Sequence, residues 1–197
     1  MDGLISVVLT DGTEIGYEYD TSLRLTKVST PYGDTSYEYD LMDRITRVID
    51  RNGVATLYEY DANGNRIAVT YGNGIVTQYV YNEVNQLISE KILDRNNNVI
   101  EVYIYTLGKT GERLKITEND IETEYTYDEL YRLTGEKVRK ADRTVRESQY
   151  TYDKVGNRLK KVTDGIITEY FYNELNQLIY ETGVTYSYDD NGNLIQK

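Results

Sequence analysis

The stretch that decides the fold reads Tyr58-Glu59-Tyr60-Asp61-Ala62-Asn63-Gly64-Asn65-Arg66. Tyr-x-Tyr places two rings on one face of a β-strand and the middle residue on the other face. Asp61 then ends the strand, because its side chain can accept hydrogen bonds from the backbone ahead of it. Gly64 supplies a positive φ in the turn, and the chain returns as a second strand. The stretch therefore predicts a β-hairpin.

The same pattern recurs along the whole chain. Nine Tyr-x-Tyr pairs hold 18 of the 22 tyrosines, and successive pairs are 16 to 25 residues apart. Most pairs are followed by Asp, then by a polar residue and Leu or Ile, and a spacing of this length indicates one small structural unit per repeat. The residues of this repeat signature are Tyr17, Tyr19, Asp20, Tyr37, Tyr39, Asp40, Tyr58, Tyr60, Asp61, Gly64, Arg66, Tyr79, Tyr81, Tyr103, Tyr105, Tyr125, Tyr127, Asp128, Tyr150, Tyr152, Asp153, Gly156, Arg158, Tyr170, Tyr172, Tyr186, Tyr188 and Asp189.

Nine hairpins in series predict an all-β fold, an antiparallel hairpin repeat array. About eighteen strands exceed the ~10 that a twisted open sheet holds without curling, so we expect a curved or spiralling sheet, a partial shell. Leu25 and Val28 lie three residues apart, as in a helix, but the segment is short and flanked by turns. Either a β-bulge or a strong local twist would bring both side chains to one face.

Composition excludes several classes of protein. The chain has 197 residues and no Cys or His, so a disulfide scaffold, a Ser-His-Asp triad and Cys- or His-ligated metal sites are excluded. Its net charge of −11 argues against nucleic acid and anionic membrane surfaces as partners. One Phe against 22 Tyr predicts a half-wet interior, because each Tyr hydroxyl still needs a hydrogen-bond partner.

Three sharper hypotheses compete with a purely structural interpretation. Asp61–Asn65 and Asp189–Asn193 are similar to calcium loops, but the order of ligands that such a loop requires is not met, and turn chemistry accounts for them. The Tyr pairs could stack on sugars, although their use in every repeat favours packing. Neighbouring carboxylates such as Asp189-Asp190 could serve as a glycosidase pair, although most of the acids fall at turns or on solvent-facing strand positions.

The repeats resemble the YD repeats of the RHS family, as in Tyr17-Glu18-Tyr19-Asp20 and in Tyr150-Thr151-Tyr152-Asp153-Lys154-Val155-Gly156-Asn157-Arg158-Leu159. This family includes bacterial polymorphic toxins, wall-associated proteins, insecticidal toxin-complex subunits and teneurins. The resemblance implies strands that spiral into a hollow shell around a toxin or another polypeptide. The Asp-Pro-x-Gly-type motif linked to self-cleavage in the family is absent, because the single Pro is Pro31.

We therefore expect residues 1–197 to form a single repeat array, a segment of a longer one, because neither end carries a polar capping repeat. The expected function is a non-enzymatic structural module of a shell that encloses or scaffolds a toxin or other polypeptide. The alternative is a surface adhesion module that binds carbohydrate through exposed Tyr. No cofactor or metal is expected. The expected partners are further repeats or another copy through open sheet edges, and an enclosed polypeptide. The resemblance implies secretion or a bacterial cell surface, although the chain shows no signal peptide.

Overall fold

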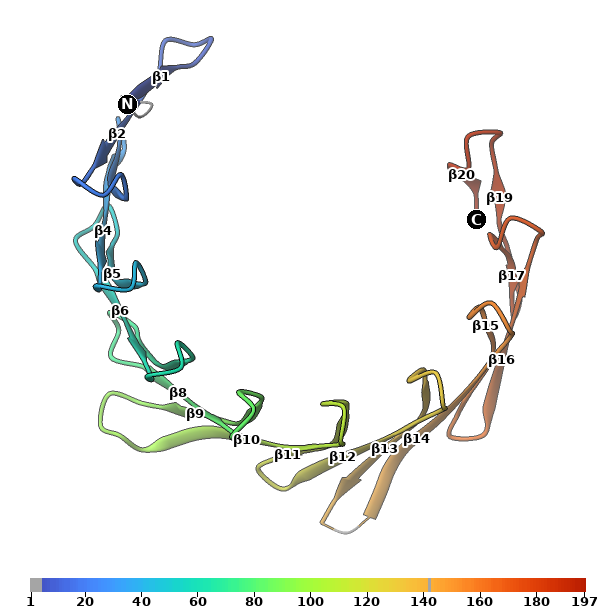
Figure 1. Cartoon of the computed structure of the whole chain (residues 1–197). Coiled ribbons are helices and arrows are strands. Elements are labelled where there is room, and N and C mark those ends of the chain that lie inside the picture. Colours follow the sequence, from blue (N-terminus) through green and yellow to red (C-terminus); the bar gives the residue numbers. More distant parts are fainter. Residues whose placement is uncertain (1–4, 142) are drawn as a thin grey trace. The chain divides into compact units, whose positions relative to one another are not determined.

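The computed structural model describes residues 5–141 and 143–197, and within these ranges the chain consists of strands and turns. It divides into two compact units, Met1–Val102 and Tyr103–Lys197, and the division falls within strand β10 (Val99–Leu107). Within each unit the strands follow one another in chain order in a single layer (Figure 1). The prediction of an all-β hairpin array is confirmed.

The first unit is an antiparallel meander in which every strand pairs with the next. Its strands are β1 (Ser6–Val8), β2 (Glu14–Tyr19), β3 (Leu25–Thr30), β4 (Gly33–Tyr39), β5 (Ile45–Ile49), β6 (Ala55–Tyr60), β7 (Arg66–Thr70), β8 (Val76–Tyr81) and β9 (Leu87–Leu93).

The second unit continues the same arrangement from β10 to β18, and a separate hairpin of β19 and β20 ends it. Its further strands are β11 (Arg113–Glu118), β12 (Ile121–Tyr127), β13 (Leu133–Lys140), β14 (Arg143–Tyr152), β15 (Arg158–Thr163), β16 (Ile166–Tyr172), β17 (Leu178–Glu181), β18 (Val184–Thr185), β19 (Ser187–Tyr188) and β20 (Leu194–Gln196).

Each Tyr-x-Tyr hairpin carries a β-bulge on its return strand. In the first repeat, Glu18 lies opposite Lys27 and Tyr19 lies opposite Leu25, so Thr26 is the extra residue. Tyr17 lies opposite Val28, so Leu25 and Val28 both face the tyrosines although they are three residues apart. A bulge, rather than twist alone, thus resolves the spacing that resembled a helix. Eight repeats place the bulge opposite the second Tyr.

The repeat of Tyr103 and Tyr105 departs from this register. Its strand runs on to Leu107, which lies opposite Arg113, and the bulge follows Thr106. This pair is the one followed by Thr rather than by Asp or Asn, so no carboxylate or amide ends the strand directly after the second Tyr.

The core is thin. Among the described residues, only Ala68, Val69 and Leu93 are buried apolar residues, and Thr77 and Ser148 are buried polar ones. A single-layered sheet leaves most side chains half-exposed on one face or the other, as the prediction of a half-wet interior requires. Stability must therefore come from contacts between neighbouring hairpins within the layer, because no second layer covers the described strands.

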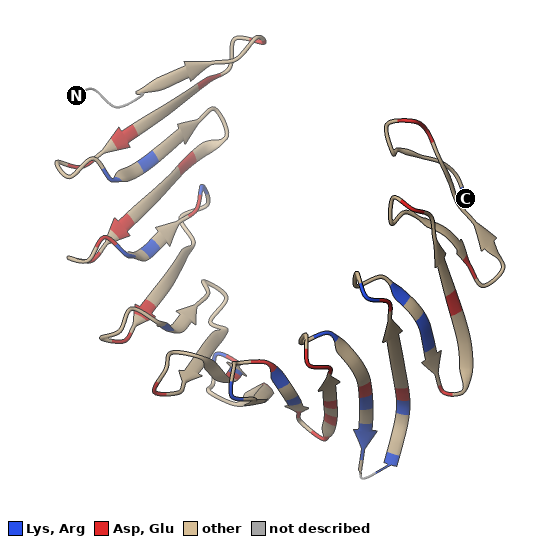
Figure 2. Cartoon of the chain, turned by 45° about the vertical axis from the view of Figure 1, so that its right-hand side comes forward, with Lys and Arg blue, Asp and Glu red and all other residues tan. Residues whose placement is uncertain are grey.

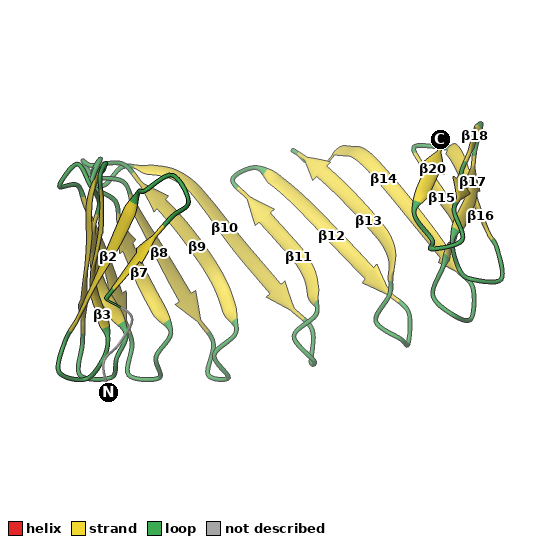
Figure 3. Cartoon of the chain, turned by 90° about the horizontal axis from the view of Figure 1, so that it is seen from above, coloured by secondary structure: helices red, strands yellow, loops and turns green. Residues whose placement is uncertain are grey.

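Two kinds of turn lie at opposite ends of the strands in each unit (Figure 3). The turns that follow the Tyr-x-Tyr strands lie at one end, and the turns that link one hairpin to the next lie at the other. We call the first kind the YD turns. Acidic and basic positions recur from hairpin to hairpin along the strands and turns (Figure 2).

Candidate functional site

The YD turn is organised by its Asp. In the first repeat, Asp20 Oδ1 accepts hydrogen bonds from the backbone N–H of Ser22 at 2.8 Å and of Arg24 at 3.0 Å. Asp20 Oδ2 pairs with Nε of Arg24 at 2.7 Å. Equivalent bonds join two further pairs four residues apart, Asp40 with Arg44 and Asp128 with Arg132. We call these three acids the turn aspartates and their partners the staple arginines.

These hydrogen bonds change the acidity of the turn. The backbone N–H of Arg24 has the largest effect and holds the pKa of Asp20 below the ordinary 3.8; desolvation opposes it, and the Arg24 guanidinium lowers the pKa further. The pKa values of Asp40 and Asp128 are lowered in the same way by Arg44 and Arg132. The turn is therefore built around the ionised carboxylate.

The staple arginines reach from one repeat to the next. Nη1 of Arg44 donates to the backbone carbonyl of Asp61 at 3.1 Å, and its guanidinium lies 4.6 Å from the ring centroid of Tyr60. Arg24 makes the same contacts with the Asp40 carbonyl and Tyr39, and Arg132 with the Asp153 carbonyl and Tyr152. One side chain thus joins its own turn aspartate to the strand end and ring of the next hairpin.

The second Tyr of a repeat makes the reverse connection. Tyr39 donates from its hydroxyl to the carbonyl of Leu25 at 2.7 Å, in the bulge of the preceding repeat. The matching bonds of Tyr60, Tyr81, Tyr127, Tyr152 and Tyr188 reach the carbonyls of Ile45, Arg66, Arg113, Leu133 and Leu178. A bulge leaves the local ladder incomplete, and the hydroxyl gives its carbonyl a partner.

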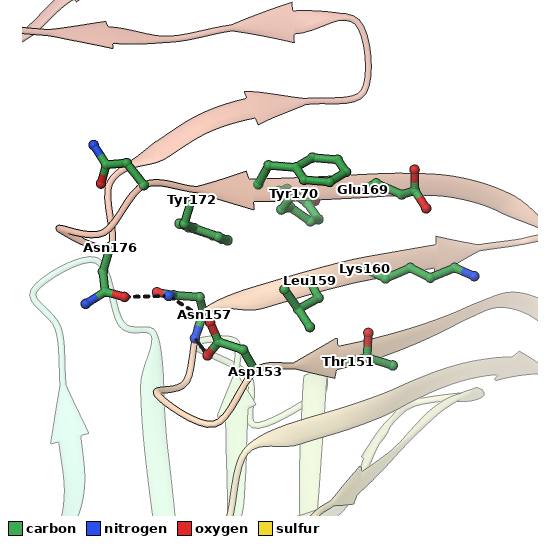
Figure 4. Close-up of a pocket in the computed structure, with 11 residues that line it drawn as sticks. Thr151, Asp153, Asn157, Leu159, Lys160, Glu169, Tyr170, Tyr172 and Asn176 are labelled. Carbon is green, nitrogen blue, oxygen red and sulfur yellow. Dashed lines mark hydrogen bonds between the residues drawn. The ribbon is translucent and has the colours of Figure 1, made fainter.

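Three repeats have Asn in place of the staple Arg, namely Asn65, Asn157 and Asn193, and the first two of these reach the next turn. Asn157 Nδ2 donates to Asp153 Oδ2 at 2.9 Å and to Asn176 Oδ1 of the next turn at 2.8 Å (Figure 4). Asn65 makes the same bonds with Asp61 and Asn85. A short amide in place of a guanidinium therefore still joins neighbouring turns.

The register shows that not all arginines of the pattern are equivalent. Arg66 and Arg158 lie opposite Tyr60 and Tyr152, where other repeats have Leu or Ile. They follow the Asn staples by one residue, and their guanidinium groups lie over Tyr79 and over Tyr150 and Tyr170. The repeat signature included these two arginines but left out the staple arginines. The staple arginines could have been recognised by their position, four residues after the Asp that ends the strand.

A hollow of about 510 Å³ lies beside Asn157 in the second unit. Thr151, Lys160, Glu169 and Leu159 line it, together with Tyr170, Tyr172 and Phe171 (Figure 4). Phe171 is 51% exposed, and its ring meets the ring of Tyr180 edge-on, with centroids 5.6 Å apart. Phe171 stands at a middle position of Tyr-x-Tyr, where three repeats have Glu.

The carboxylates and apolar segments of the described residues bear on two other kinds of site, a metal site and a membrane span. Within the described ranges, no cluster of three or more carboxylates could hold a metal ion. The oxygens of Asp61 and Asp189 are occupied by N–H groups of their own turns. Over the same residues, no helix has the length and apolar character to cross a membrane.

The repeats, bulges and staples define the class of the protein as a single-layered array of β-hairpins. Residues 39–76 and 60–96 match the family model named RHS Repeat. Residues 39–96 therefore carry RHS repeats, as the YD-like sequence indicates. No curated protein matches it.

Solved structures that contain TccC3 share the fold. The crystal structure of TcdB2-TccC3-Cdc42 matches with a TM-score of 0.69 and 22% identity, over 90% of this chain and 12% of that one. TcdB2-TccC3 without its hypervariable C-terminal region gives 0.73 and 21%, over 96% and 14%. The Photorhabdus luminescens Tc holotoxin pore gives 0.73 and 17%, over 94% and 12%. At these identities the likeness concerns the fold, and the chain spans about one eighth of the proteins it matches.

Proposed function

We propose that the chain is a non-enzymatic wall module of an RHS-type shell that encloses or scaffolds a toxin or another polypeptide. The observation that carries the proposal is the staple, because in five repeats it ties one hairpin to the next, side by side and without a second layer. Such a sheet can be lengthened by any number of hairpins, which is what a wall requires. The likeness to toxin-complex structures over most of this chain supports it.

The proposal extends to partners and place. Further repeats, of the same protein or another copy, would join at the open sheet edges, where backbone groups are unpaired. The enclosed polypeptide would meet a wall face. The shell would act outside the cell or at a bacterial surface, in keeping with the holotoxin in which a similar fold occurs.

The test is the size and content of the native product. We would isolate it from source cells with an antibody against this chain, and then combine electron microscopy with limited proteolysis. We expect a hollow particle far heavier than 22.8 kDa, with a segment protected until mild denaturant opens the wall. A native product near 22.8 kDa with no protected segment would contradict the proposal.

Carbohydrate binding is a second candidate function, and Phe171 and Tyr180 beside the hollow are the observation that favours it. The Tyr pairs support it less, because many of their hydroxyls bond to backbone carbonyls of the preceding repeat. A glycan array separates the two functions. Binding that is lost in Phe171→Ser, with the fold retained, would support adhesion.

A further inference from the structure

The apices of three consecutive YD turns in the second unit are apolar and exposed. Leu130, Val155 and Leu175 occupy the same place in their turns, two residues after Asp or Asn, and are 68%, 71% and 76% exposed. Tyr131, beside Leu130, is 58% exposed. We call these four residues the apolar ridge. Soluble proteins seldom gather large apolar side chains on one exposed edge without a partner.

Turn chemistry does not require these side chains. Each of the three apex residues donates its backbone N–H to the Asp or Asn that starts the turn, at 2.9 to 3.0 Å. Ser22 and Asn63 make the same bond at 2.8 and 2.9 Å in other repeats. A polar residue therefore fits the position equally well.

Tyr131 adds a second, independent observation. Its φ is +59°, a left-handed conformation that disfavours a bulky side chain. The equivalent residues of the next two turns are Gly156 and Asn176, which adopt this conformation more readily. The turn thus keeps an exposed aromatic ring in a backbone conformation that disfavours it, just as the first repeat keeps the exposed Leu23 at φ +63°.

The ridge is rigid and evenly spaced. Arg132 donates to the Asp153 carbonyl at 2.8 Å and Asn157 donates to Asn176 at 2.8 Å, so the three turns are tied to one another. Two strands of about 4.8 Å each separate successive turns by about 9.6 Å. Seven residues of an α-helix advance by about 10.5 Å, so a helix along the ridge would present every seventh residue to successive apices.

Charges beside the ridge select the partner. Glu129, Lys154 and Glu174 each precede an apex residue, are exposed, and form no ion pair within the described part of the chain. The row reads negative, positive, negative. A second copy of this ridge, in either direction, would place Glu opposite Glu and Lys opposite Lys, so self-association is disfavoured.

We propose that the apolar ridge docks an amphipathic helix of a partner polypeptide. The helix carries apolar residues seven positions apart, flanked in order by basic, acidic and basic residues. This proposal does not depend on the shell, because it rests on the ridge alone.

The test uses a labelled helical peptide with leucines seven residues apart, flanked in order by Lys, Glu and Lys, and a second peptide with the flanking charges reversed. We would measure binding to the full chain by fluorescence anisotropy. We expect the first peptide to bind about tenfold more tightly than the second.

Variants locate the site. The triple variant Leu130→Ser, Val155→Ser, Leu175→Ser should weaken binding at least about tenfold. The control Leu41→Ser, Met42→Ser changes an exposed apex of the first unit and should leave binding unchanged. The swap Glu129→Lys, Lys154→Glu, Glu174→Lys should reverse the preference between the peptides. All these side chains are exposed, so circular dichroism should show the native fold. No binding, equal affinity for both peptides, or an unaffected triple variant would overturn the proposal.

Discussion

Removal of one hydroxyl group tests whether the inter-repeat contacts hold the sheet together. In Tyr60→Phe the ring remains, and with it the stacking of Arg44 at 4.6 Å from the ring centroid. The lost contact is the hydrogen bond from the Tyr60 hydroxyl to the Ile45 carbonyl, 2.8 Å long. A hydrogen bond of this kind contributes about 0.5–1.5 kcal/mol net to the free energy of unfolding. The Ile45 carbonyl that loses its partner lies in a bulge, where few other donors can replace the hydroxyl.

We therefore expect Tyr60→Phe to lower the free energy of unfolding by about 1 kcal/mol. For a chain of this length that corresponds to a fall in Tm of about 2–4 °C, and to about 4–8 °C if the first unit unfolds alone. Thermal unfolding followed by circular dichroism measures it, and hydrogen exchange of residues 45–60 reports where the loss occurs.

Tyr32→Phe is the matched control in the same unit. Tyr32 is 77% exposed, and within the described ranges its hydroxyl has no hydrogen-bond partner, so its removal should leave Tm unchanged. Equal Tm values for the two variants would refute the view that Tyr hydroxyls join neighbouring repeats. Tyr186→Phe, which loses a bond to Glu181 only five residues away, would then show whether any hydroxyl matters.

Three further results follow from the same geometry. Gly74→Ala should lower Tm more than Gly53→Ala: both have positive φ, but a Cβ at Gly74 would lie 2.8 Å from Cβ of Arg95, whereas one at Gly53 meets no atom within 4 Å. Acid should destabilise the chain, because the turn aspartates have lowered pKa values when folded. Their contribution to the free energy of unfolding is complete above the unfolded pKa of about 3.9 and is lost as pH falls through the folded pKa. Measuring Tm over an acid titration would show this loss. Alkali should destabilise the chain too, because burial raises the pKa of Tyr39 and Tyr125. Their contribution to stability is complete below the unfolded pKa of about 10 and is lost as pH rises through the folded pKa. Tm and tyrosinate absorbance, followed together against pH, measure this loss.

The sequence by itself determined the hairpins. Tyr-x-Tyr, the Asp that ends the strand and the Gly in the turn are all local signals, since each acts on backbone within a few residues. The composition also indicated a half-wet sheet, because 22 Tyr against one Phe leaves many hydroxyls that need hydrogen-bond partners. The spacing of Leu25 and Val28 could not separate a bulge from twist, because both place the side chains on one face.

Only the tertiary structure decided how the repeats hold one another. Arg44, Asn65 and Arg66 all read as polar residues after a turn, yet Arg44 and Asn65 bind the next hairpin while Arg66 stands where other repeats have Leu. The difference depends on the register of the bulge, which is set by pairing across strands and not by local sequence. The exposed apices, likewise, look like ordinary turn residues until the neighbouring turns are seen to lie side by side.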